Sequence, residues 1–478
     1  MRKTKIIATL GPRWSNEEMI GKILENGADV CRLNFSFGTY EEHAERINII
    51  RKTSERLQKP IAILADLQGP KIRIGKLKEN VTVKEGDIVK LSGYKEVSDD
   101  SILPTTHSNI AHDVRSGSML LIADGTIQLV VESSDEKEKL VVCKVVTGGT
   151  ILTGKGINLP GAHVTTEILT EKDISDALFA GKNGANFVGM SFVRTADDVR
   201  RLRKILDDEG LYNVGIVSKI ENTQALENLE AIVAESDGVM VARGDLGVEI
   251  PFGEVPIWQK KIINLANSMG KIAITATQML ESMTKSPVPS RAEASDVANA
   301  VFDGTDLVMM SAETASGDYP VESVKAMVSI ATAAENSMIR QKTFDEIHYN
   351  EKGVNIPLAD SASYLSHCLN HKAIIVLSKT GRTVLSLSKK RPKTPILFVS
   401  ANKDLCNKLA ICNNVHTIHV EKDLNFAGCE DTAIQIKALQ EILIKRGFVN
   451  SGDVAMLVSG DKWEGLWQEN SIRIVKIN

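Results

Sequence analysis

Two charged residues, two positions apart, are the first candidates for chemistry in this sequence. Lys219 and Glu221 lie in the stretch IVSKIEN (216–222), at the end of a run of alternating apolar residues. In an extended strand, residues two apart point to the same side. An ammonium and a carboxylate would therefore sit together at the end of an apolar strand. Such a pair is either a surface ion pair, which is common at strand ends, or the centre of an active site.

Other charged residues follow other apolar runs. Asp245 stands between glycines in ARGDLG (242–247), where backbone N–H groups can face a bound anion. Carboxylates from two successive strands, with room for water, suit Mg²⁺ or Mn²⁺, and the alternative is a structural role. Further cations are Arg32, Arg73 and Lys155. Any one of them, considered alone, would be interpreted as a solvated surface residue. Together with the acids they fit a phosphate-bearing substrate, because phosphoryl transfer needs positioning and charge neutralisation.

Polar residues close several of the same runs with amide, hydroxyl and carboxylate oxygens. They could contact a substrate, or they could cap the core through hydrogen bonds. These residues are Asn34, Ser36, Asp66, Thr277, Gln278, Ser311 and Glu313.

These residues lie at the ends of eight short runs of apolar, β-branched residues. Each run ends in a few polar residues or glycines. Runs without strict alternation are typical of strands buried on both faces of a parallel sheet. The runs are 5–12, 29–36, 61–70, 187–194, 214–222, 238–245, 271–278 and 306–314. Eight strands with helices between them predict a (β/α)₈ barrel, an α/β fold whose active site lies at the carboxyl ends of the strands. The polar phrases fall at those ends.

Helical signals fill most of the gaps between the runs. Thr195 and Asp198 have capping-box spacing at the start of 195–206. Pro320 stands at a first helical position, and apolar residues recur at helical intervals over 320–335.

Two regions depart from this strand–helix pattern. About 120 residues separate the third run from the fourth. Within them, apolar and polar residues alternate as in β-strands, for example at 118–133. This predicts a β-rich domain inserted after strand three, and insertions at a catalytic face often act as lids. After about residue 345, a separate doubly wound α/β domain is expected. The predicted domains are a barrel from 1–69 and 169–345, an inserted lid from 70–168, and a C-terminal α/β domain from 346–478.

Length, composition and cysteine usage exclude several classes of protein. The 478 residues suggest about three domains, and 43% apolar with 25% charged residues is typical of a soluble globular protein. A formal charge of −4 gives no general electrostatic case for nucleic acid or anionic membrane. The six cysteines form no C-x-x-C pair, which favours reduced thiols. The apolar run after MRKTK is too short for a signal peptide, so we expect a cytoplasmic protein.

Taken in order along the chain, these motifs resemble pyruvate kinase. IVSKIENTQAL (216–226) is similar to the family's active-site signature, and that motif is specific. The other matching motifs, in family order, are RLNFS, GPKIR, KGINLPG, SFVR, ARGDLGVEI, TATQMLESM, RAEASDVANAVFDGTD and SAETASGDYP. The resemblance covers essentially the whole chain, and SFVR and ARGDLGVEI flank the signature. It implies transfer of the phosphoryl group of phosphoenolpyruvate to ADP, giving pyruvate and ATP, the final step of glycolysis.

The resemblance also implies roles for individual residues. Glu221 and Asp245 would hold the divalent ion, Mg²⁺ or Mn²⁺, that bridges enolate and phosphate. Lys219 would stabilise charge on the transferring phosphoryl group, Arg32 would contact phosphate, and Thr277 would lie near the carbon that is protonated. The implied substrate-binding residues are Arg32, Ala242, Arg243, Gly244, Asp245, Thr277, Ser311 and Glu313. The implied nucleotide-binding residues are Asn34, Ser36, Phe37, Arg73 and Lys155.

The sequence departs from the family pattern at two places. Many members have histidine after NFS, at the nucleotide site, whereas this chain has Phe37. Potassium-requiring members usually read D-T-K-G-P-E where this chain reads DLQGPK (66–71), so Leu67 removes a hydroxyl and Lys71 replaces an acid. The monovalent-cation pocket would be formed by Asn34, Ser36, Asp66 and Leu67. We expect the Lys71 ammonium to replace the ion, and activity not to require K⁺.

The C-terminal region and the quaternary structure are further expectations from the resemblance. The segment Ser378, Lys379, Thr380, Gly381, Arg382 and Thr383 would bind the phosphate of a sugar-phosphate or nucleotide-monophosphate activator, although an ordinary helix cap would look alike. The second effector loop is usually rich in glycine and threonine, but here it reads GDKWEGLWQEN (460–470). Arg291 is a candidate contact between subunits, and a homotetramer is expected.

Two rival functions remain open at this stage. A metal-dependent aldolase or lyase on a similar barrel would also bind a pyruvate enolate, but it would not need Lys155 in the insert or a lysine beside the metal. A catalytically inactive relative kept for ligand sensing is the rival from another class. Phe37 favours that reading slightly, and the intact Lys219, Glu221 and Asp245 count against it.

Overall fold

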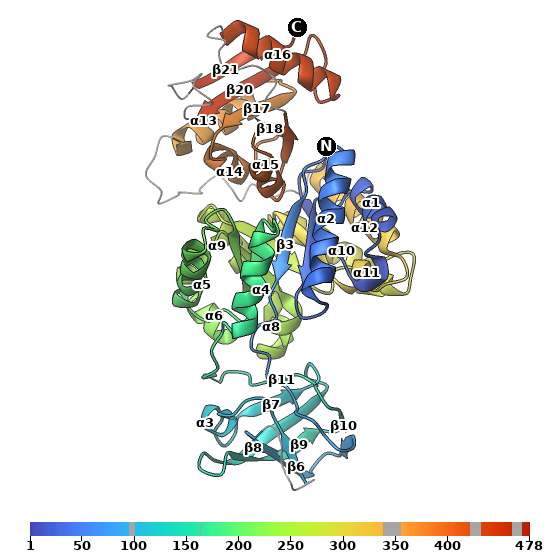
Figure 1. The fold of residues 1–478 in the computed structure, drawn as a ribbon, viewed down its shortest axis with the longest axis vertical. Helices are drawn as coiled ribbons and strands as arrows, with labels where there is room; N and C mark the ends of the chain where they lie inside the picture. Colours follow the sequence, from blue (N-terminus) through green and yellow to red (C-terminus); the bar gives the residue numbers. More distant parts are fainter. Residues whose placement is uncertain (95–100, 163, 338–354, 421–431, 461–470) are drawn as a thin grey trace.

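A closed barrel of parallel strands forms the centre of the molecule (Figure 1). This computed structural model describes residues 1–94, 101–162, 164–337, 355–420, 432–460 and 471–478. In order around the barrel the strands are β1 (Lys5–Thr9), β16 (Leu307–Met310), β15 (Ile272–Ala276), β14 (Gly238–Ala242), β13 (Gly215–Ile220), β12 (Phe187–Met190), β3 (Ala62–Asp66) and β2 (Val30–Asn34). The predicted (β/α)₈ barrel is confirmed, and each of the eight apolar runs contains one strand.

Each strand ends before the apolar run that contains it, because the polar residues at the end of the run do not continue the hydrogen bonding of the barrel sheet. Every residue of β1, β3, β14 and β15 is buried, as expected for strands covered on both faces. β15 ends at Ala276, since Thr277 and Gln278 adopt left-handed backbone angles, with φ of 68° and 53°.

Helices surround the barrel on its outer side. Those following the strands are α1 (Glu17–Glu25), α2 (Tyr40–Arg56), α4 (Glu171–Lys182), α5 (Ala196–Asp208), α6 (Thr223–Glu227), α7 (Leu229–Glu235), α8 (Arg243–Glu249), α9 (Val255–Ser268), α10 (Arg291–Phe302), α11 (Ala312–Ala315) and α12 (Pro320–Asn336). Short 3₁₀ turns lie at η1 (Pro12–Trp14), η2 (Phe252–Glu254) and η3 (Glu281–Thr284).

The predicted helix starts are found in the structure. The Asp198 carboxylate accepts a hydrogen bond of 2.7 Å from the backbone N–H of Thr195, at the start of α5. Pro320 is the first residue of α12. Among the helices of the described residues, none has the length and apolar character that crossing a membrane requires.

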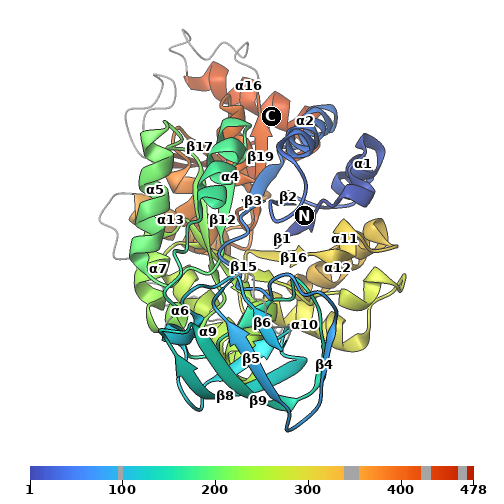
Figure 2. The ribbon, with the colours of Figure 1, turned by 60° about the horizontal axis from the view of Figure 1, so that its bottom comes forward.

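The segment between β3 and α4 forms a β-rich domain with its own core. One sheet has the order β11 (Ile157–Asn158), β7 (Met119–Ile122), β8 (Ile127–Asp135), β9 (Leu140–Thr147), β5 (Ile88–Ser92) and β6 (Ile102–Pro104). A second pairs β10 (Gly149–Ile151) with β4 (Val81–Val83), and α3 (Ile110–Asp113) is the short helix. Its apolar cluster contains no barrel-strand residue. Figure 2, in which this insert comes forward, shows it in front of the barrel.

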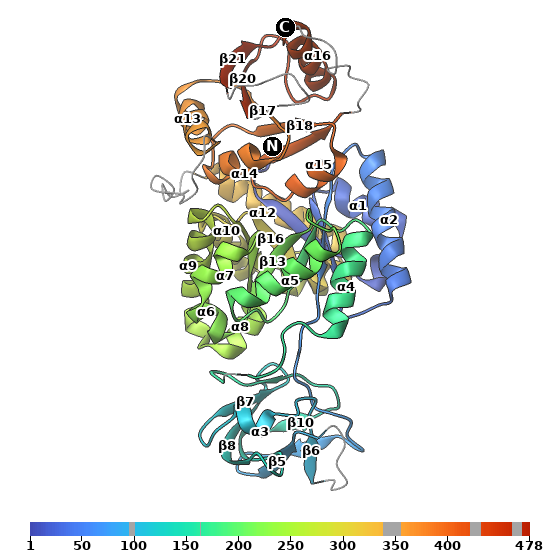
Figure 3. The same cartoon turned by 60° about the vertical axis from the view of Figure 1, so that its left-hand side comes forward.

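The C-terminal part of the chain forms a second α/β layer. Its sheet has the order β19 (Val415–His419), β18 (Ile396–Ser400), β17 (Ala373–Ser378), β20 (Val454–Gly460) and β21 (Ser471–Lys476), and only β21 is antiparallel to its neighbour. The helices are α13 (Asn355–Cys368), α14 (Arg382–Lys389), α15 (Lys403–Leu409) and α16 (Thr432–Lys445). Figure 3 shows α14 and α15 on the barrel side of this sheet and α16 on the far side.

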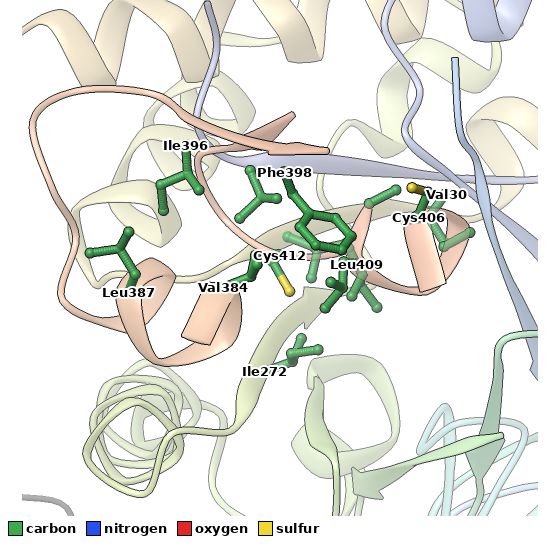
Figure 4. Packing of buried hydrophobic residues seen from close by; sticks show 14 of the residues in the cluster. Val30, Ile272, Val384, Leu387, Ile396, Phe398, Cys406, Leu409 and Cys412 are labelled. Carbon is green, nitrogen blue, oxygen red and sulfur yellow. The ribbon is translucent and has the colours of Figure 1, made fainter. Parts of the chain in front are cut away.

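The C-terminal domain and the insert lie at opposite ends of the barrel (Figures 1 and 3). Barrel residues such as Val30 and Ile272 belong to the same apolar cluster as Phe398 and Leu409 of the C-terminal domain. Figure 4 shows these side chains converging at the junction of the two domains. The core of the C-terminal domain therefore continues into the barrel, whereas the core of the insert is separate.

A buried ion cluster also joins the barrel to the C-terminal domain. Asp306 immediately precedes β16, is fully buried and ion-pairs with Lys389 and Arg391, the Arg391 distance being 2.8 Å. It also accepts a hydrogen bond of 2.8 Å from the N–H of Ala273 at the start of β15. Burial alone would raise the pKa of Asp306, but Arg391 and Lys389 outweigh burial and lower it.

We predict that Asp306→Asn destabilises the protein by about 3–5 kcal/mol at neutral pH, because two buried cations lose their counter-charge. Chemical denaturation measures this loss. The pKa of Asp306 is lower in the folded state, so its contribution is present above the unfolded pKa and is lost as the pH falls through the folded value. Glu209→Gln removes an exposed ion pair with Lys182 and should cost less than about 1 kcal/mol. Equal effects of the two substitutions would contradict this account.

Candidate active site

Asp66 is the centre of the charged cluster at the carboxyl ends of the strands. Its carboxylate ends β3 and is 1% exposed. The Oδ2 atom accepts a hydrogen bond of 2.6 Å from the Arg32 guanidinium on β2, and the Oδ1 atom lies 3.4 Å from Lys219 Nζ on β13. Burial alone would raise the pKa of Asp66, but Lys219 and Arg32 lower it. Because this carboxylate stays ionised, it positions both cations at the barrel mouth.

Lys219 points into the same cluster and is held by three elements. Its Nζ atom donates a 2.8 Å hydrogen bond to Ser191 Oγ, which follows β12, and lies 2.9 Å from Glu221 Oε1. Burial would lower the pKa of Lys219, but the carboxylates of Asp66, Glu221 and Asp245 raise it above its ordinary value. The ammonium is therefore charged at neutral pH. The opening pair of the sequence does lie together, as expected from its spacing.

Glu221 has the electrostatic surroundings of a cation ligand. Its Oε2 atom accepts a 2.7 Å hydrogen bond from the N–H of Phe192, and its Oε1 atom is ion-paired with Lys219 Nζ at 2.9 Å. Burial raises the pKa of Glu221, Lys219 opposes that shift, and the neighbouring Asp245 adds to it. A buried acid whose pKa is raised by a neighbouring carboxylate can be stabilised in its charged form by a bound divalent cation.

Gly244 and Thr277 bring the ends of β14 and β15 together. The N–H of Gly244 donates a 2.8 Å hydrogen bond to Thr277 Oγ1, and the same hydroxyl donates to the carbonyl of Ala276 at 2.6 Å. A Cβ at position 244 would lie 3.4 Å from Thr277 Oγ1, an ordinary van der Waals distance, so the contact itself does not require glycine. Ala242 is buried at the end of β14, directly before α8.

The side chain of Arg243 holds the loop that follows β15. Its guanidinium donates to the carbonyls of Ala276 at 3.3 Å and of Thr277 at 2.7 Å, and it ion-pairs with Asp296 of α10 at 2.7 Å. These bonds fix the left-handed backbone at Thr277. The sequence placed Arg243 among the substrate-binding residues, and in the structure its side chain is engaged with protein carbonyls.

Ser311 and Glu313 are joined to the same loop. The buried Glu313 accepts hydrogen bonds from the N–H of Ser311 at 2.7 Å and from the N–H of Leu280 at 3.1 Å. Burial raises the pKa of Glu313, and its hydrogen bonds with backbone N–H groups oppose that shift. Both carboxylate oxygens of Glu313 therefore serve to connect the end of β16 to the loop after β15.

The loop after β2 is ordered around Asn34. The Asn34 side chain accepts a 3.0 Å hydrogen bond from the N–H of Ser36, and the N–H of Phe35 donates to the carbonyl of Asp66 at 2.9 Å. The Phe37 ring is 70% exposed, which is unusual for a large apolar side chain.

Arg73 and Lys155 lie together on the insert. The Arg73 guanidinium donates to the carbonyl of Gly154 at 2.9 Å, and the N–H of Ile74 donates to the carbonyl of Lys155 at 2.8 Å. The Lys155 side chain is exposed. These two cations thus belong to the inserted domain, and any contact with a substrate in the barrel depends on where that domain sits.

The placement of Lys71 differs from the expected monovalent-cation pocket. Its Nζ atom lies 3.6 Å from Asp245 and 3.8 Å from Asp124 of the insert, and it forms no ion pair with Asp66. The carboxylate of Asp66 instead forms ion pairs with Arg32 and Lys219. The Leu67 side chain is buried, as a residue without a ligand atom would be.

The candidate effector segment follows β17. The Ser378 hydroxyl accepts a 3.0 Å hydrogen bond from the N–H of Gly381, whose φ of 78° is left-handed and which directly precedes α14. Lys379, Thr380 and Arg382 are exposed, and Thr383 is buried. In the second expected effector loop, residues 461–470 lie outside the described residues.

Three residues that hold the site were not singled out from the sequence. Ser191 bonds to Lys219, Asp296 pairs with Arg243, and Thr9 Oγ1 accepts a 3.0 Å hydrogen bond from Arg32. Ser191 and Thr9 could have been found because both stand at the ends of predicted strands. Asp296 carries no such signal, since it lies within a helix distant in sequence.

The fold and the site define a barrel phosphotransferase with two accessory domains. The model described as pyruvate kinase, barrel domain, matches residues 1–324, and that described as pyruvate kinase, alpha/beta domain, matches residues 357–475. The chain is 40% identical to pyruvate kinases of Staphylococcus aureus (strain MRSA252) and Bacillus licheniformis, over 96% of this chain and 78% of each relative. A crystal structure of a pyruvate kinase from Cryptosporidium parvum has 35% identity and a TM-score of 0.92, covering 100% of this chain and 96% of that one.

The chain therefore belongs to the pyruvate kinase family. It is a phosphotransferase that moves the phosphoryl group of phosphoenolpyruvate to ADP, giving pyruvate and ATP. Divalent-metal dependence is general to that family.

We predict that Arg243→Lys lowers kcat by about 10- to 100-fold, because one ammonium cannot bind two loop carbonyls and Asp296 at once and Thr277 is displaced. Steady-state kinetics measure the change, and KM for phosphoenolpyruvate should change less than kcat. Arg200→Lys is the matched control, since Arg200 forms an exposed ion pair with Glu235. An unchanged kcat in Arg243→Lys would show that the loop does not depend on this guanidinium.

Proposed function

We propose that the cluster formed by Arg32, Asp66, Lys219, Glu221 and Asp245 is the catalytic centre of the pyruvate kinase reaction. The observation that carries this proposal is the buried Lys219 ammonium, 2.9 Å from Glu221 and 2.8 Å from Ser191. A fixed cation of this kind can neutralise charge that develops on a transferring phosphoryl group without reorganising. Arg32 adds a planar donor suited to phosphate oxygens.

We propose Glu221 and Asp245 as the ligands of Mg²⁺ or Mn²⁺. The described residues contain no group of three or more His, Cys, Asp or Glu side chains placed to hold a metal. Two carboxylates fit Mg²⁺ nonetheless, because this ion is usually bound by one or two carboxylates, water and substrate phosphate. The burial of Glu221 close to the charge of Asp245, which raises its pKa, supports that assignment. When bound, the ion supplies positive charge next to the reacting oxygens.

The remaining residues would bind and orient the substrate. The backbone at Ala242, Arg243 and Gly244 would orient the pyruvate carboxylate, at the start of α8. The Thr277 hydroxyl would lie near the carbon that gains a proton. Ser311 and Glu313 support this position from β16, since Glu313 binds the N–H of Leu280 in the same loop.

We propose that the inserted domain is a lid that brings nucleotide contacts to the barrel. Arg73 and Lys155 lie on it, while Asn34, Ser36 and Phe37 lie on the barrel side. The Arg194 guanidinium binds the carbonyls of Val164 and Thr166, where the chain re-enters the barrel, and this contact anchors the hinge. The proposed boundaries are 1–69 and 169–345 for the barrel, 70–168 for the lid and 346–478 for the C-terminal domain.

Regulation and assembly are proposed chiefly from membership of the family. The segment 378–383 would bind the phosphate of an activating sugar phosphate or nucleotide monophosphate, and its exposed Lys379 and Arg382 support that role. A cytoplasmic homotetramer is proposed, with Arg291 at the start of α10 as a contact between subunits. Size-exclusion chromatography with light scattering tests the tetramer.

A coupled assay for pyruvate tests the catalytic proposal. With phosphoenolpyruvate, ADP and Mg²⁺ the protein should turn over, and Lys219→Met should lower kcat by about 10²–10³-fold or more, through loss of transition-state charge stabilisation. Removing the metal with EDTA should abolish turnover. Lys182→Met is a control, because Lys182 is an exposed partner of Glu209 on the outside of the barrel. Mg²⁺-independent turnover, or full activity in Lys219→Met, would contradict the assignment.

We predict activity without K⁺, because the Lys71 ammonium, 3.6 Å from Asp245, supplies a built-in cation beside the proposed metal site. Replacing K⁺ by tetramethylammonium at equal ionic strength should change kcat less than about twofold. Lys71→Glu should create a K⁺ requirement, because it restores an acid at this position. Activation of many-fold by K⁺ in the parent protein would disprove the prediction.

Phe37 is proposed to alter nucleotide binding, since an exposed apolar ring replaces an imidazole donor. Phe37→His should change KM for ADP by about threefold or more while KM for phosphoenolpyruvate stays constant, as expected for one altered contact. Tyr212→His is a control, because its ring is equally exposed but lies outside the site. Equal KM values for ADP in Phe37→His and the parent would remove Phe37 from the nucleotide site.

A further inference from the structure

A second cleft lies between the barrel and the C-terminal domain, apart from the barrel mouth. It encloses about 700 Å³, within the range of small-molecule sites, and its walls come from both domains. The barrel contributes the end of α2 and the segment up to Pro60. The C-terminal domain contributes the start of α15, the end of the edge strand β19 and the end of α16.

The lining of this cleft is strongly cationic. Lys59, Lys403, Lys445 and Arg446 face it, and Glu55 is the acid among its lining residues. The four cations against one carboxylate in the lining leave a formal excess of three positive charges, which the pairing of Lys59 with Asp29 reduces to two, although the whole chain carries a formal charge of −4. A concave site with this local charge attracts multiply charged anions.

Two of these cations have no partner among the residues that the structure describes. Lys403 ion-pairs with Glu55, and Lys59 ion-pairs with Asp29 at 3.7 Å and donates to the carbonyl of Ala28 at 2.7 Å. Across the part of the chain that the structure describes, the side chains of Lys445 and Arg446 form no hydrogen bond and no ion pair. They are therefore available to a ligand, and Arg446 can bind phosphate oxygens in a bidentate manner.

The favourable interaction of a cation with the C-terminus of a helix explains only part of this clustering of cations. Lys445 ends α16, where a cation offsets the partial negative charge of the last carbonyls. That effect concerns α16 alone, and it does not account for Lys59 and Lys403, which come to the same cleft from the barrel and from α15.

We propose that this cleft binds a small molecule bearing a multiply charged phosphate group, with Lys445 and Arg446 as its principal contacts. The site is separate from the proposed effector segment 378–383, none of whose residues lines it. Its occupant would bridge the barrel and the C-terminal domain, since Lys59 and the last turn of α2 form the opposite wall.

Titration calorimetry of the full chain with inorganic pyrophosphate, in EDTA, tests the proposal. The double variant Lys445→Gln/Arg446→Gln should bind with a Kd about tenfold or more higher than the parent, since two charge-assisted contacts are lost. Lys437→Gln is the matched control, because Lys437 is exposed on the same helix outside the cleft, and it should bind like the parent. Arg382→Ala should also bind like the parent, and unchanged thermal unfolding should show that the double variant is folded.

Three results would overturn the proposal. The first is equal binding of pyrophosphate by the parent and the double variant. The second is loss of binding in Arg382→Ala, which would place the anion at the effector segment. The third is an equal Kd for citrate in the parent, which would show a general anion site without preference for phosphate.

Discussion

The structure of the catalytic end depends on one buried carboxylate, that of Asp66. It ends β3 and faces Arg32 on one side and Lys219 on the other, so it fixes cations from two different strands. A charge buried to this degree is tolerated only when it is paired, and Asp66 provides the carboxylate that Arg32 and Lys219 share. Parallel closure of the barrel makes the arrangement possible, because the carboxyl ends of β2, β3 and β13 all meet at one rim.

The same principle operates at the opposite end of the barrel. Asp306 pairs with Lys389 and Arg391 where β16 begins, while apolar side chains of both domains fill the space around the junction (Figure 4). The C-terminal domain is thus joined to the barrel by a shared core and a buried charge cluster. The insert has a separate core, so its position depends on fewer contacts, such as those of Arg194 and Lys71.

The proposed site at the barrel mouth is supported by side chains that bind protein backbone groups. Arg243 and Glu313 bind backbone groups of the loop after β15 and hold Thr277 in a left-handed conformation. That conformation is unfavourable for a β-branched residue, and it persists because hydrogen bonds from two neighbouring strands fix it. These two side chains therefore position the loop after β15, whereas Lys219 belongs to the buried charged cluster.

The sequence by itself determined the eight strands, the helix starts at Thr195 and Pro320, and the pairing of Lys219 with Glu221. Each of these follows from local spacing, since strand period, capping residues and apolar runs need only neighbours in the chain. Only the tertiary structure decided that Lys71 lies beside Asp245 rather than Asp66. The same is true of the hydrogen bonds from Arg243 to the loop after β15, and of the cleft that Lys59 and Arg446 both line. These partners are distant in sequence, and which of several charged groups meets a given acid depends on how the domains pack.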